Sequence, residues 1–307
     1  GTFERASQQR SIQLVTIVGE PGVGKSRLAA ELFAYVDAKP DPTRWRQGRC
    51  LPYGEGITFW ALGEIVKAEA SILESDSAEV AAAKLDAAVS AEEPDRQWLL
   101  QRLAPLVGVE AGSPAERQEL FTAWRRFFEG LAASNPTVLV FEDLHWANEA
   151  LLAFLEYLAE WSQEVPLLVL CAARPELYER RPDWGAGLRN ATTINLSPLS
   201  DRETAELVSY LATSTLLSQE LEGAILERAG GNPLYAEEFV RLLADRGLDA
   251  LSEALAPESV QALIAARLDT LSPERKSLLQ DAAVVGKVFW ASALAEMGSR
   301  GSSEVEL

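Results

Sequence analysis

A glycine-rich segment that follows an apolar run constrains this chain more than any other feature. Residues 14–28 read LVTIVGEPGVGKSRL, with three glycines inside six positions. Glycine costs backbone entropy, so packing alone does not account for three of them here. The segment matches GxxxxGK followed by Ser, between a predicted strand and a predicted helix, which is the context that a phosphate-binding loop requires.

The chemistry of such a loop explains its composition. Gly19, Gly22 and Gly24 let successive backbone N–H groups face an anion, and the helix N-terminus adds the positive end of its dipole. Lys25 is expected to reach the terminal phosphates, and the Ser26 hydroxyl is expected to bind magnesium. The alternative, an ordinary strand-to-helix turn, is disfavoured by the full match of the motif.

Two adjacent carboxylates follow a second apolar run. In TVLVFEDLHWAN, Glu142 and Asp143 come directly after Phe141, so we expect them at the end of a neighbouring parallel strand. One carboxylate can hold magnesium and the other can orient or deprotonate the attacking water. They could instead cap the next helix, but Asn148 is the better cap.

A third apolar run ends at Arg174, whose guanidinium could meet a phosphate with two parallel hydrogen bonds. The alternative for Arg174 is a surface salt bridge. His145 is the only histidine, and it lies just beyond the two carboxylates. Because it has no nearby Cys or His in the sequence, we expect a structural or supporting role rather than a metal site.

The apolar pattern predicts the architecture. Val, Ile and Leu cluster at 13–18, 137–141, 166–171 and 192–196, with a weaker candidate strand at 45–51, and helical periodicity separates these runs. The alternation predicts an α/β fold, a parallel sheet with helices on both faces. One helix is expected to begin at Pro114 with Ser113 as its cap. After Leu199 only helical patterns follow.

The composition limits the function classes. The 307 residues include 28 Lys and Arg against 46 Asp and Glu, a formal charge of -18, which argues against general affinity for nucleic acid or anionic membranes. The longest apolar stretch, VPLLVLCAA, is too short to span a bilayer. Cys50 and Cys171 are expected to be buried free thiols of a reducing, cytoplasmic compartment. The start at Gly1, with Met297 as the only methionine, predicts a piece of a longer protein.

Four ordered motifs together resemble the STAND class of P-loop ATPases. They are GEPGVGKSRL, VLVFEDLHWAN, the strand ending at Arg174 and GNPLYAEEFV. The similarity is greatest to the ATPase module of large LuxR-type activators and multidomain class III nucleotide cyclases, and PYGEGITFWAL at 52–62 also fits that group. The resemblance implies an ASCE/AAA-like P-loop NTPase domain at 1–199, an all-helical lid at 200–256 and the truncated start of a winged-helix-like domain at 257–307.

The resemblance also implies roles for single residues. Glu142 and Asp143 would form the Walker B pair, Arg174 the sensor arginine, and Pro233 the lid proline that packs near adenine. Magnesium would be bound by Ser26, Glu142 and Asp143. The nucleotide-binding Walker A segment would comprise Gly19, Glu20, Pro21, Gly22, Val23, Gly24, Lys25, Ser26 and Arg27.

The sequence departs from the family pattern in two places. The family's Gly-Arg-Glu element, which helps form the base pocket, would stand before residue 1 and is not part of this sequence. Nucleotide affinity is therefore expected to be weak. Glu142 stands where many relatives carry Asp, which leaves open which of Glu142 and Asp143 activates water.

The predicted function is therefore a regulatory switch that binds ATP or ADP with Mg²⁺, hydrolyses ATP slowly and controls a larger signalling or transcriptional protein. Its expected partners are effector and sensor domains of the same parent chain, and ATP is expected to permit self-association. One alternative is a nucleotide-binding switch without significant turnover. Another is an AAA+ initiator-like ATPase on DNA, which the negative charge and the absence of an evident basic DNA-binding helix disfavour. A small-molecule kinase is weaker still.

Overall fold

The computed structural model describes residues 1–52, 58–110, 115–212, 219–246, 264–265, 268 and 271–285. The chain divides into two compact units, Gly1–Ser197 and Pro198–Leu307. The predicted winged-helix-like segment at 257–307 lies largely outside the described residues.

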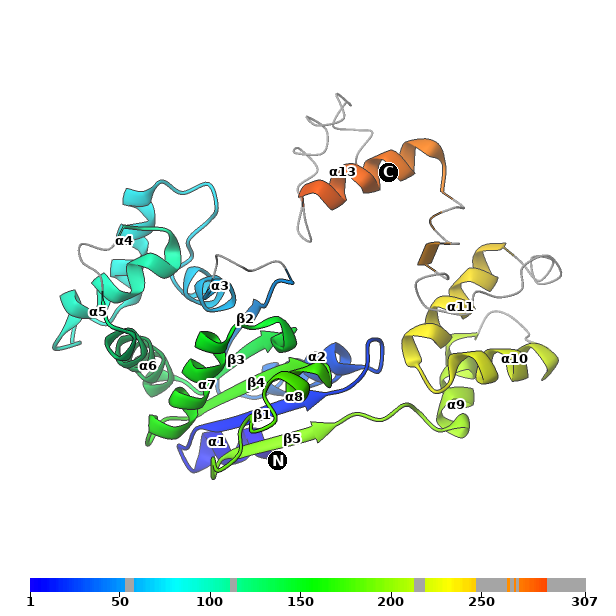
Figure 1. Cartoon of the computed structure of the whole chain (residues 1–307), viewed down its shortest axis with the longest axis horizontal. Coiled ribbons are helices and arrows are strands. Elements are labelled where there is room, and N and C mark those ends of the chain that lie inside the picture. The colour runs from blue at the N-terminus through cyan, green and yellow to red at the C-terminus, as the bar shows by residue number, and fades with distance from the viewer. Residues whose placement is uncertain are drawn as a thin grey trace. The chain divides into compact units, whose positions relative to one another are not determined.

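The first unit is built on a five-stranded sheet in which all neighbouring strands are parallel (Figure 1). The strands are β1 (Gln13–Val18), β2 (Arg44–Arg49), β3 (Thr137–Glu142), β4 (Leu167–Ala173) and β5 (Ala191–Asn195). The predicted fold class is confirmed, and the weaker candidate strand at 45–51 is β2. Because the strands are parallel, all five carboxyl ends lie at one edge of the sheet.

The order of the strands, β2-β3-β4-β1-β5, corrects one expectation. The sequence suggested that the carboxylate strand β3 would neighbour the loop strand β1, but β4 lies between them. The burial of the strands gives the physical reason. Every residue of β1 and β4 is buried, whereas β5 is mostly exposed, so the most apolar strands take the centre.

Helices cover both faces of this sheet, as the alternating pattern predicted (Figure 1). One face packs against α1 (Thr2–Gln8) and α2 (Lys25–Asp37). The larger core lies on the other face, formed with α3 (Trp60–Glu69), α4 (Ala78–Ala88), α5 (Arg96–Leu103), the short helix η1 (Ala104–Val107), α6 (Arg117–Ser134) and α7 (Glu149–Trp161).

Alternation along the strands divides the core into two layers. Val138 and Val140 of β3 belong to the cluster with α1 and α2, whereas Leu139 and Phe141 belong to the larger cluster. This period of two is what a strand buried on both faces requires. The aromatic residues Trp124, Phe127 and Phe128 of α6 are all buried in the larger cluster.

Close packing of α3 on β2 depends on one glycine. A Cβ added at Gly48 would lie 2.0 Å from the carbonyl oxygen of Ala61, so any side chain there would displace the helix. The absence of a side chain at Gly48 thus lets α3 lie close to the end of β2, whose last residue is Arg49.

The predicted start of α6 was too early. Ser113 and Pro114 lie outside the described residues, but residues 115 and 116 are not helical and the helix begins at Arg117. Glu116 occupies the cap position without a side-chain capping bond.

The described part of the second unit is helical. It contains α9 (Asp201–Leu211), α10 (Gln219–Ala229), α11 (Pro233–Arg246) and α13 (Pro273–Val285). Ser200 and Glu203 form a reciprocal capping box at the start of α9. A small core unites α9, α10 and α11, and it consists of Val208, Ile225, Ala229, Tyr235, Ala236, Phe239 and Val240.

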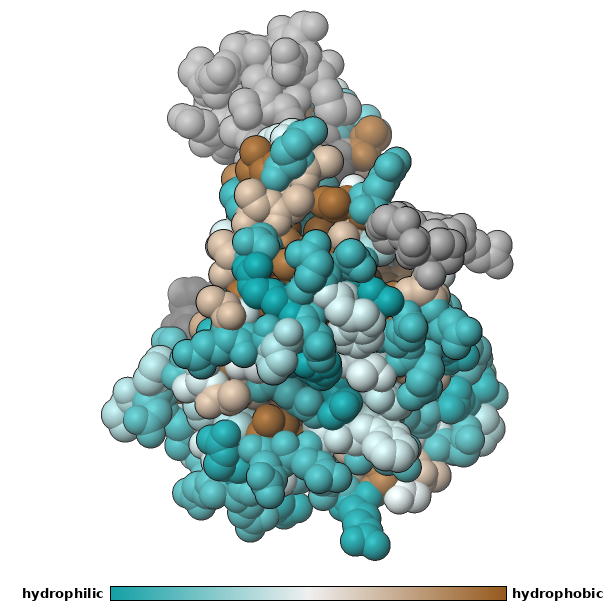
Figure 2. Space-filling view, turned by 90° about the vertical axis from the view of Figure 1, so that its left-hand side faces the viewer, coloured by the Kyte–Doolittle hydropathy of each residue, from teal (hydrophilic) through white to brown (hydrophobic). Residues whose placement is uncertain are grey.

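Figure 2 shows that the surface on the side of α4, α5 and α6 is largely hydrophilic, with smaller hydrophobic patches among the polar residues. Ion pairs lie on these helices, including Arg96 with Asp86 and Arg102 with Glu119. Within the described ranges, none of the helices combines the length and the apolar character needed to cross a membrane.

Candidate functional site

The glycine-rich loop runs from the end of β1 to Lys25, the first residue of α2. Gly22 has φ 83° and Gly24 has φ 108°, in the left-handed region that favours glycine. Gly19 is required for a different reason, because a Cβ there would lie 2.6 Å from Cγ1 of Val23 and 3.1 Å from the carbonyl oxygen of Leu196. The loop therefore needs glycine at each of the three predicted positions.

The loop leaves backbone donors available at the start of α2. The amide of Val23 donates to the Glu20 carbonyl, but within the described residues the amides of Gly22, Gly24 and Ser26 donate to no protein acceptor. The first amides of a helix lack intrahelical partners and carry the positive end of the helix dipole. Such a group of donors suits the oxygens of a phosphate chain.

The Lys25 ammonium lies over its own loop. Nζ donates to the carbonyl oxygens of Gly19 and Glu20 at 2.6 and 2.9 Å. Burial lowers the pKa of Lys25, and the nearby Arg174 cation lowers it further, while Asp143 acts in the opposite direction. Lys25, Arg174 and Asp143 are thus brought into one electrostatic environment by segments far apart in sequence.

Ser26 and Arg27 lie on the exposed first turn of α2. The Arg27 guanidinium forms an ion pair with Glu31 at 2.6 Å, one turn along the helix, and its side chain is 80% exposed. Any contribution of Arg27 to a ligand in this arrangement would come from its backbone.

The two carboxylates occupy different surroundings at the end of β3. Glu142 is the last residue of the strand, and Asp143 follows with φ 52° and ψ 40°, which is uncommon for a residue with a side chain. Oδ2 of Asp143 accepts from Nε of Arg49 at 2.5 Å, and Nη2 of Arg49 lies at 2.5 Å from the same oxygen.

Arg49 is a site residue that the sequence reasoning missed. It ends β2 and stands opposite Glu142 in the register of the sheet. The available signal was its position within the weaker strand candidate at 45–51, close to the sheet edge where the other strands end.

Arg174 follows β4, between the loop strand and the carboxylate strand. Its amide donates to Nδ1 of His145 at 3.4 Å, and its guanidinium carbon lies 5.6 Å from the centre of the Trp146 ring. In the described part of the chain no carboxylate forms an ion pair with Arg174, so the surface salt bridge considered as an alternative is not seen there.

His145 and Trp146 belong to a short helical turn, η2 (Leu144–Trp146), directly after the carboxylates. His145 is only 4% exposed. Burial lowers the pKa of His145, and the Arg174 cation contributes to the same direction, so the ring is neutral near pH 7.

A second arginine missed from the sequence holds this turn in place. Arg180 ends the short helix α8 (Glu176–Arg180) and donates from Nη1 to the His145 carbonyl at 2.6 Å and from Nη2 to the Ala147 carbonyl at 2.9 Å. The segment from Arg174 to Arg180 therefore contacts η2 through the arginine at each of its two ends.

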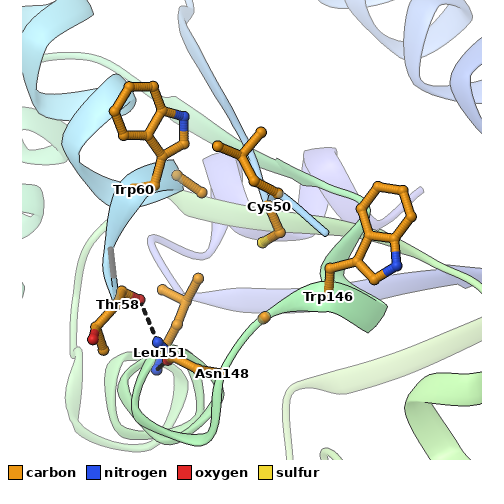
Figure 3. A pocket seen from close by; sticks show the side chains of 9 residues that line it. Cys50, Thr58, Trp60, Trp146, Asn148 and Leu151 are labelled. Carbon is orange, nitrogen blue, oxygen red and sulfur yellow. Dashed lines mark hydrogen bonds between the residues drawn. The ribbon is translucent and has the colours of Figure 1, made fainter. Parts of the chain in front are cut away.

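A small pocket lies beside Trp146, between the end of β2 and the starts of α3 and α7 (Figure 3). Asn148 caps α7 by accepting from the Leu151 amide at 2.9 Å, and its Nδ2 donates to the Thr58 carbonyl at 2.8 Å. The expected role of Asn148 as the helix cap is confirmed, so Glu142 and Asp143 are not the caps of α7. The pocket is lined by Cys50, Leu51, Thr58, Trp60, Ala61, Trp146, Ala147, Asn148 and Leu151.

The cysteines do not contribute reactive groups. Cys50 and Cys171 are both buried free thiols, as expected. Burial raises the pKa of Cys50 to about 12 and raises that of Cys171 as well. A thiol with such a pKa is protonated at neutral pH and is a poor nucleophile.

The donors at this edge fit a magnesium nucleotide. A cluster of three His, Cys, Asp or Glu side chains able to hold a metal alone does not occur among the described residues. Magnesium typically uses one or two protein oxygens and takes the rest from phosphate and water. The hydroxyl of Ser26 and the carboxylates of Glu142 and Asp143 are such oxygen donors, and the free loop amides suit the phosphates.

Pro233 lies in the second unit, as the first residue of α11. Gly230 and Gly231 have φ 50° and 77°, and the Asn232 side chain accepts from the amides of Leu234 and Tyr235. The segment GGNP is thus a glycine turn, a cap and an N-terminal proline, which together start a helix.

The parallel sheet, the glycine loop and the charged groups at one edge define a P-loop nucleotide-binding domain. The family model for the AAA ATPase domain matches residues 1–170, over half of the chain. The chain belongs to the AAA ATPase domain family.

The chain is also similar to one curated protein and to solved structures. The chain is 28% identical over 289 residues to an uncharacterized protein of Rhizobium meliloti (strain 1021), covering 89% of this chain and 27% of that protein. A solved STAND protein with a tetratricopeptide repeat sensor from Pyrococcus horikoshii superposes on 98% of this chain and 36% of its own, with 15% identity and TM-score 0.54. A RuvB variant of Thermotoga maritima covers 99% of this chain and 80% of its own, with 14% identity and TM-score 0.42.

These findings confirm the predicted P-loop ATPase fold and the resemblance to a STAND-class module. The chain spans about a quarter of the length of the curated relative and about a third of the STAND protein.

Proposed function

We propose that the first unit binds ATP with Mg²⁺ and hydrolyses it slowly, as a regulatory switch within a larger protein. The observation that carries this proposal is the convergence of Lys25, Asp143 and Arg174 at the carboxyl edge of one parallel sheet, beside unpaired loop amides. Ligands of open α/β sheets bind at this edge.

The residues divide the work by position. The loop amides and Lys25 bind the phosphate chain, and Arg174, after the strand between the loop and the carboxylates, contacts the terminal phosphate. Ser26, Glu142 and Asp143 hold the magnesium and orient the attacking water. The bound ion would supply neutralisation of the charge that develops on the phosphate oxygens.

The contact between Arg49 and Asp143 supports the proposal of slow turnover. The Arg49 guanidinium lies 2.5 Å from Oδ2 of Asp143, so this oxygen is already occupied by a charged donor. For Oδ2 to accept from the attacking water or from a magnesium-bound water, its contact with Arg49 would have to break, and this step would add to the barrier.

Two observations support the switch role. The fold is similar to that of a STAND protein, and the chain covers only 36% of that protein and 27% of the curated relative, as a module of a larger protein would. In this proposal the helical segment at 200–256 is a lid whose Pro233 packs near adenine, and residues 257–307 begin a winged-helix-like domain. Effector and sensor domains of the parent chain would respond to the nucleotide, and ATP would permit self-association.

Single-turnover hydrolysis tests the proposal against a binding-only switch. With protein in excess over γ-labelled ATP and Mg²⁺, we expect phosphate release in the wild type. Asp143→Asn should bind ATP without releasing phosphate, and Glu142→Gln should lose the magnesium dependence of binding. Binding without release in the wild type would identify a switch without turnover, and equal rates in all three proteins would remove both carboxylates from the reaction.

A further inference from the structure

We propose that His145 is a positioning residue. It holds the backbone of Arg174 so that the Arg174 guanidinium meets the terminal phosphate. The proposal rests on the proposed function, because it assigns His145 a part in distinguishing ATP from ADP. His145 itself touches no phosphate in this account and acts only through the backbone of Arg174.

The hydrogen bond identifies the ring nitrogen of His145 that contacts Arg174. Nδ1 of His145 accepts from the Arg174 amide at 3.4 Å, so in the neutral ring the proton is on Nε2. Nε2 is buried and has no hydrogen-bond partner among the described residues. The contact with Arg174 is therefore the polar interaction that the buried ring makes within the described structure.

A residue kept only for packing would not require this arrangement. His145 is 4% exposed, and a buried polar atom without a partner is unfavourable relative to an apolar ring of similar size. The unpaired Nε2 is a cost of having an acceptor at Nδ1. An acceptor at that position is what the Arg174 amide needs at the point where β4 ends.

Two further contacts tie the same two segments together. The Arg174 guanidinium lies over the ring of Trp146, and Arg180 donates to the carbonyls of His145 and Ala147. These contacts link the segment from Arg174 to Arg180 with η2, which directly follows the carboxylates. Of these contacts, only the His145 hydrogen bond acts on the backbone of Arg174 itself.

Two variants of His145 separate the acceptor from the ring. Asn places Oδ1 close to the position of Nδ1 and so keeps an acceptor while it loses the ring, whereas Phe keeps a buried ring and loses the acceptor. Calorimetric Kd values for Mg-ATP and Mg-ADP are measured for the wild type, His145→Asn, His145→Phe and Arg174→Ala. Thermal unfolding of each variant reports on folding independently.

We expect His145→Phe to weaken ATP binding by about tenfold and to leave ADP binding almost unchanged, as Arg174→Ala does, because a misplaced guanidinium loses its charge-assisted contact. His145→Asn should keep the ratio of the two affinities close to that of the wild type. The double variant with Arg174→Ala should show no loss beyond that of Arg174→Ala alone.

If His145→Phe kept the wild-type ratio of ATP to ADP affinity and His145→Asn lost it, His145 would serve packing. That result would overturn the proposal. Parallel losses for ATP and ADP, or a failure of Asn to restore the ratio, would overturn it as well. If Arg174→Ala leaves ATP binding intact, the assigned role of Arg174 fails and the role of His145 fails with it. A wild type that binds neither nucleotide would contradict the proposed function itself.

Discussion

Arg49 contacts a single oxygen of Asp143 through two of its nitrogens, Nε and Nη2, each 2.5 Å from Oδ2. The two residues end neighbouring strands: Arg49 is the last residue of β2, and Asp143 follows the last residue of β3. Because the side chains are 38% and 20% exposed, solvent weakens the pair. The contact therefore occupies one oxygen of the carboxylate, and solvent screening makes it a weak interaction to break.

Replacing Arg49 should accelerate hydrolysis. In Arg49→Gln the Asp143 carboxylate no longer has to break an ion pair, and for a partly exposed pair we expect the single-turnover rate to rise about two- to fivefold. Arg46→Gln is the matched control, since it removes a charge from the same strand, where Arg46 pairs with Glu69 instead. A lower rate in Arg49→Gln with an unchanged control would show that Arg49 assists the reaction.

Arg174 should distinguish the two nucleotides. The terminal phosphate exists only in ATP, and a charge-assisted contact to it contributes about 1.5 to 3 kcal/mol, or roughly tenfold or more in affinity. Arg174→Ala should weaken ATP binding by that factor and leave ADP binding unchanged in calorimetric titrations. Arg189→Ala, an exposed arginine of the same unit, controls for the loss of charge. Equal losses for the two nucleotides would assign Arg174 to the shared part of the ligand.

Much of this site could be predicted because local patterns determine it. The buried strands, the glycine loop and the residues that follow β1, β3 and β4 are all encoded within short segments. The placement of β4 between β1 and β3 depends on which strands bury best together, and that is a property of the whole sheet.

The arginines that organise the site were missed for the same reason. Arg49 meets Asp143 across 94 positions of sequence, and Arg180 meets His145 across 35. These pairs arise only once the strand order is set. The start of α6 was missed for a local reason. Ser113 and Pro114 are residues typical of a helix start, but the helix begins at Arg117.

The close approach of α3 to β2 should make Gly48 sensitive to any side chain. In Gly48→Ala the new methyl group would meet the Ala61 carbonyl at 2.0 Å, and displacement of the helix should cost about 1 to 3 kcal/mol of unfolding free energy. Gly130→Ala is the matched control, because this helical position has open space around it, and Ala there should stabilise by about 0.5 to 1 kcal/mol. Urea denaturation measures both, and similar midpoints for the two variants would contradict the packing account.

The central claim, that the loop between β1 and α2 is the nucleotide site, is tested most directly by calorimetric titration of Mg-ATP into the wild type and Lys25→Ala. The ammonium lies over the loop carbonyls and has no carboxylate ion partner among the described residues, so its removal should leave the fold intact. We expect the wild type to bind Mg-ATP and Lys25→Ala to lose measurable binding. Lys39→Ala is the control and should keep the wild-type affinity, because Lys39 lies just beyond the C-terminal end of α2 and pairs with Glu4. Equal ATP affinities for the wild type and Lys25→Ala would contradict the claim.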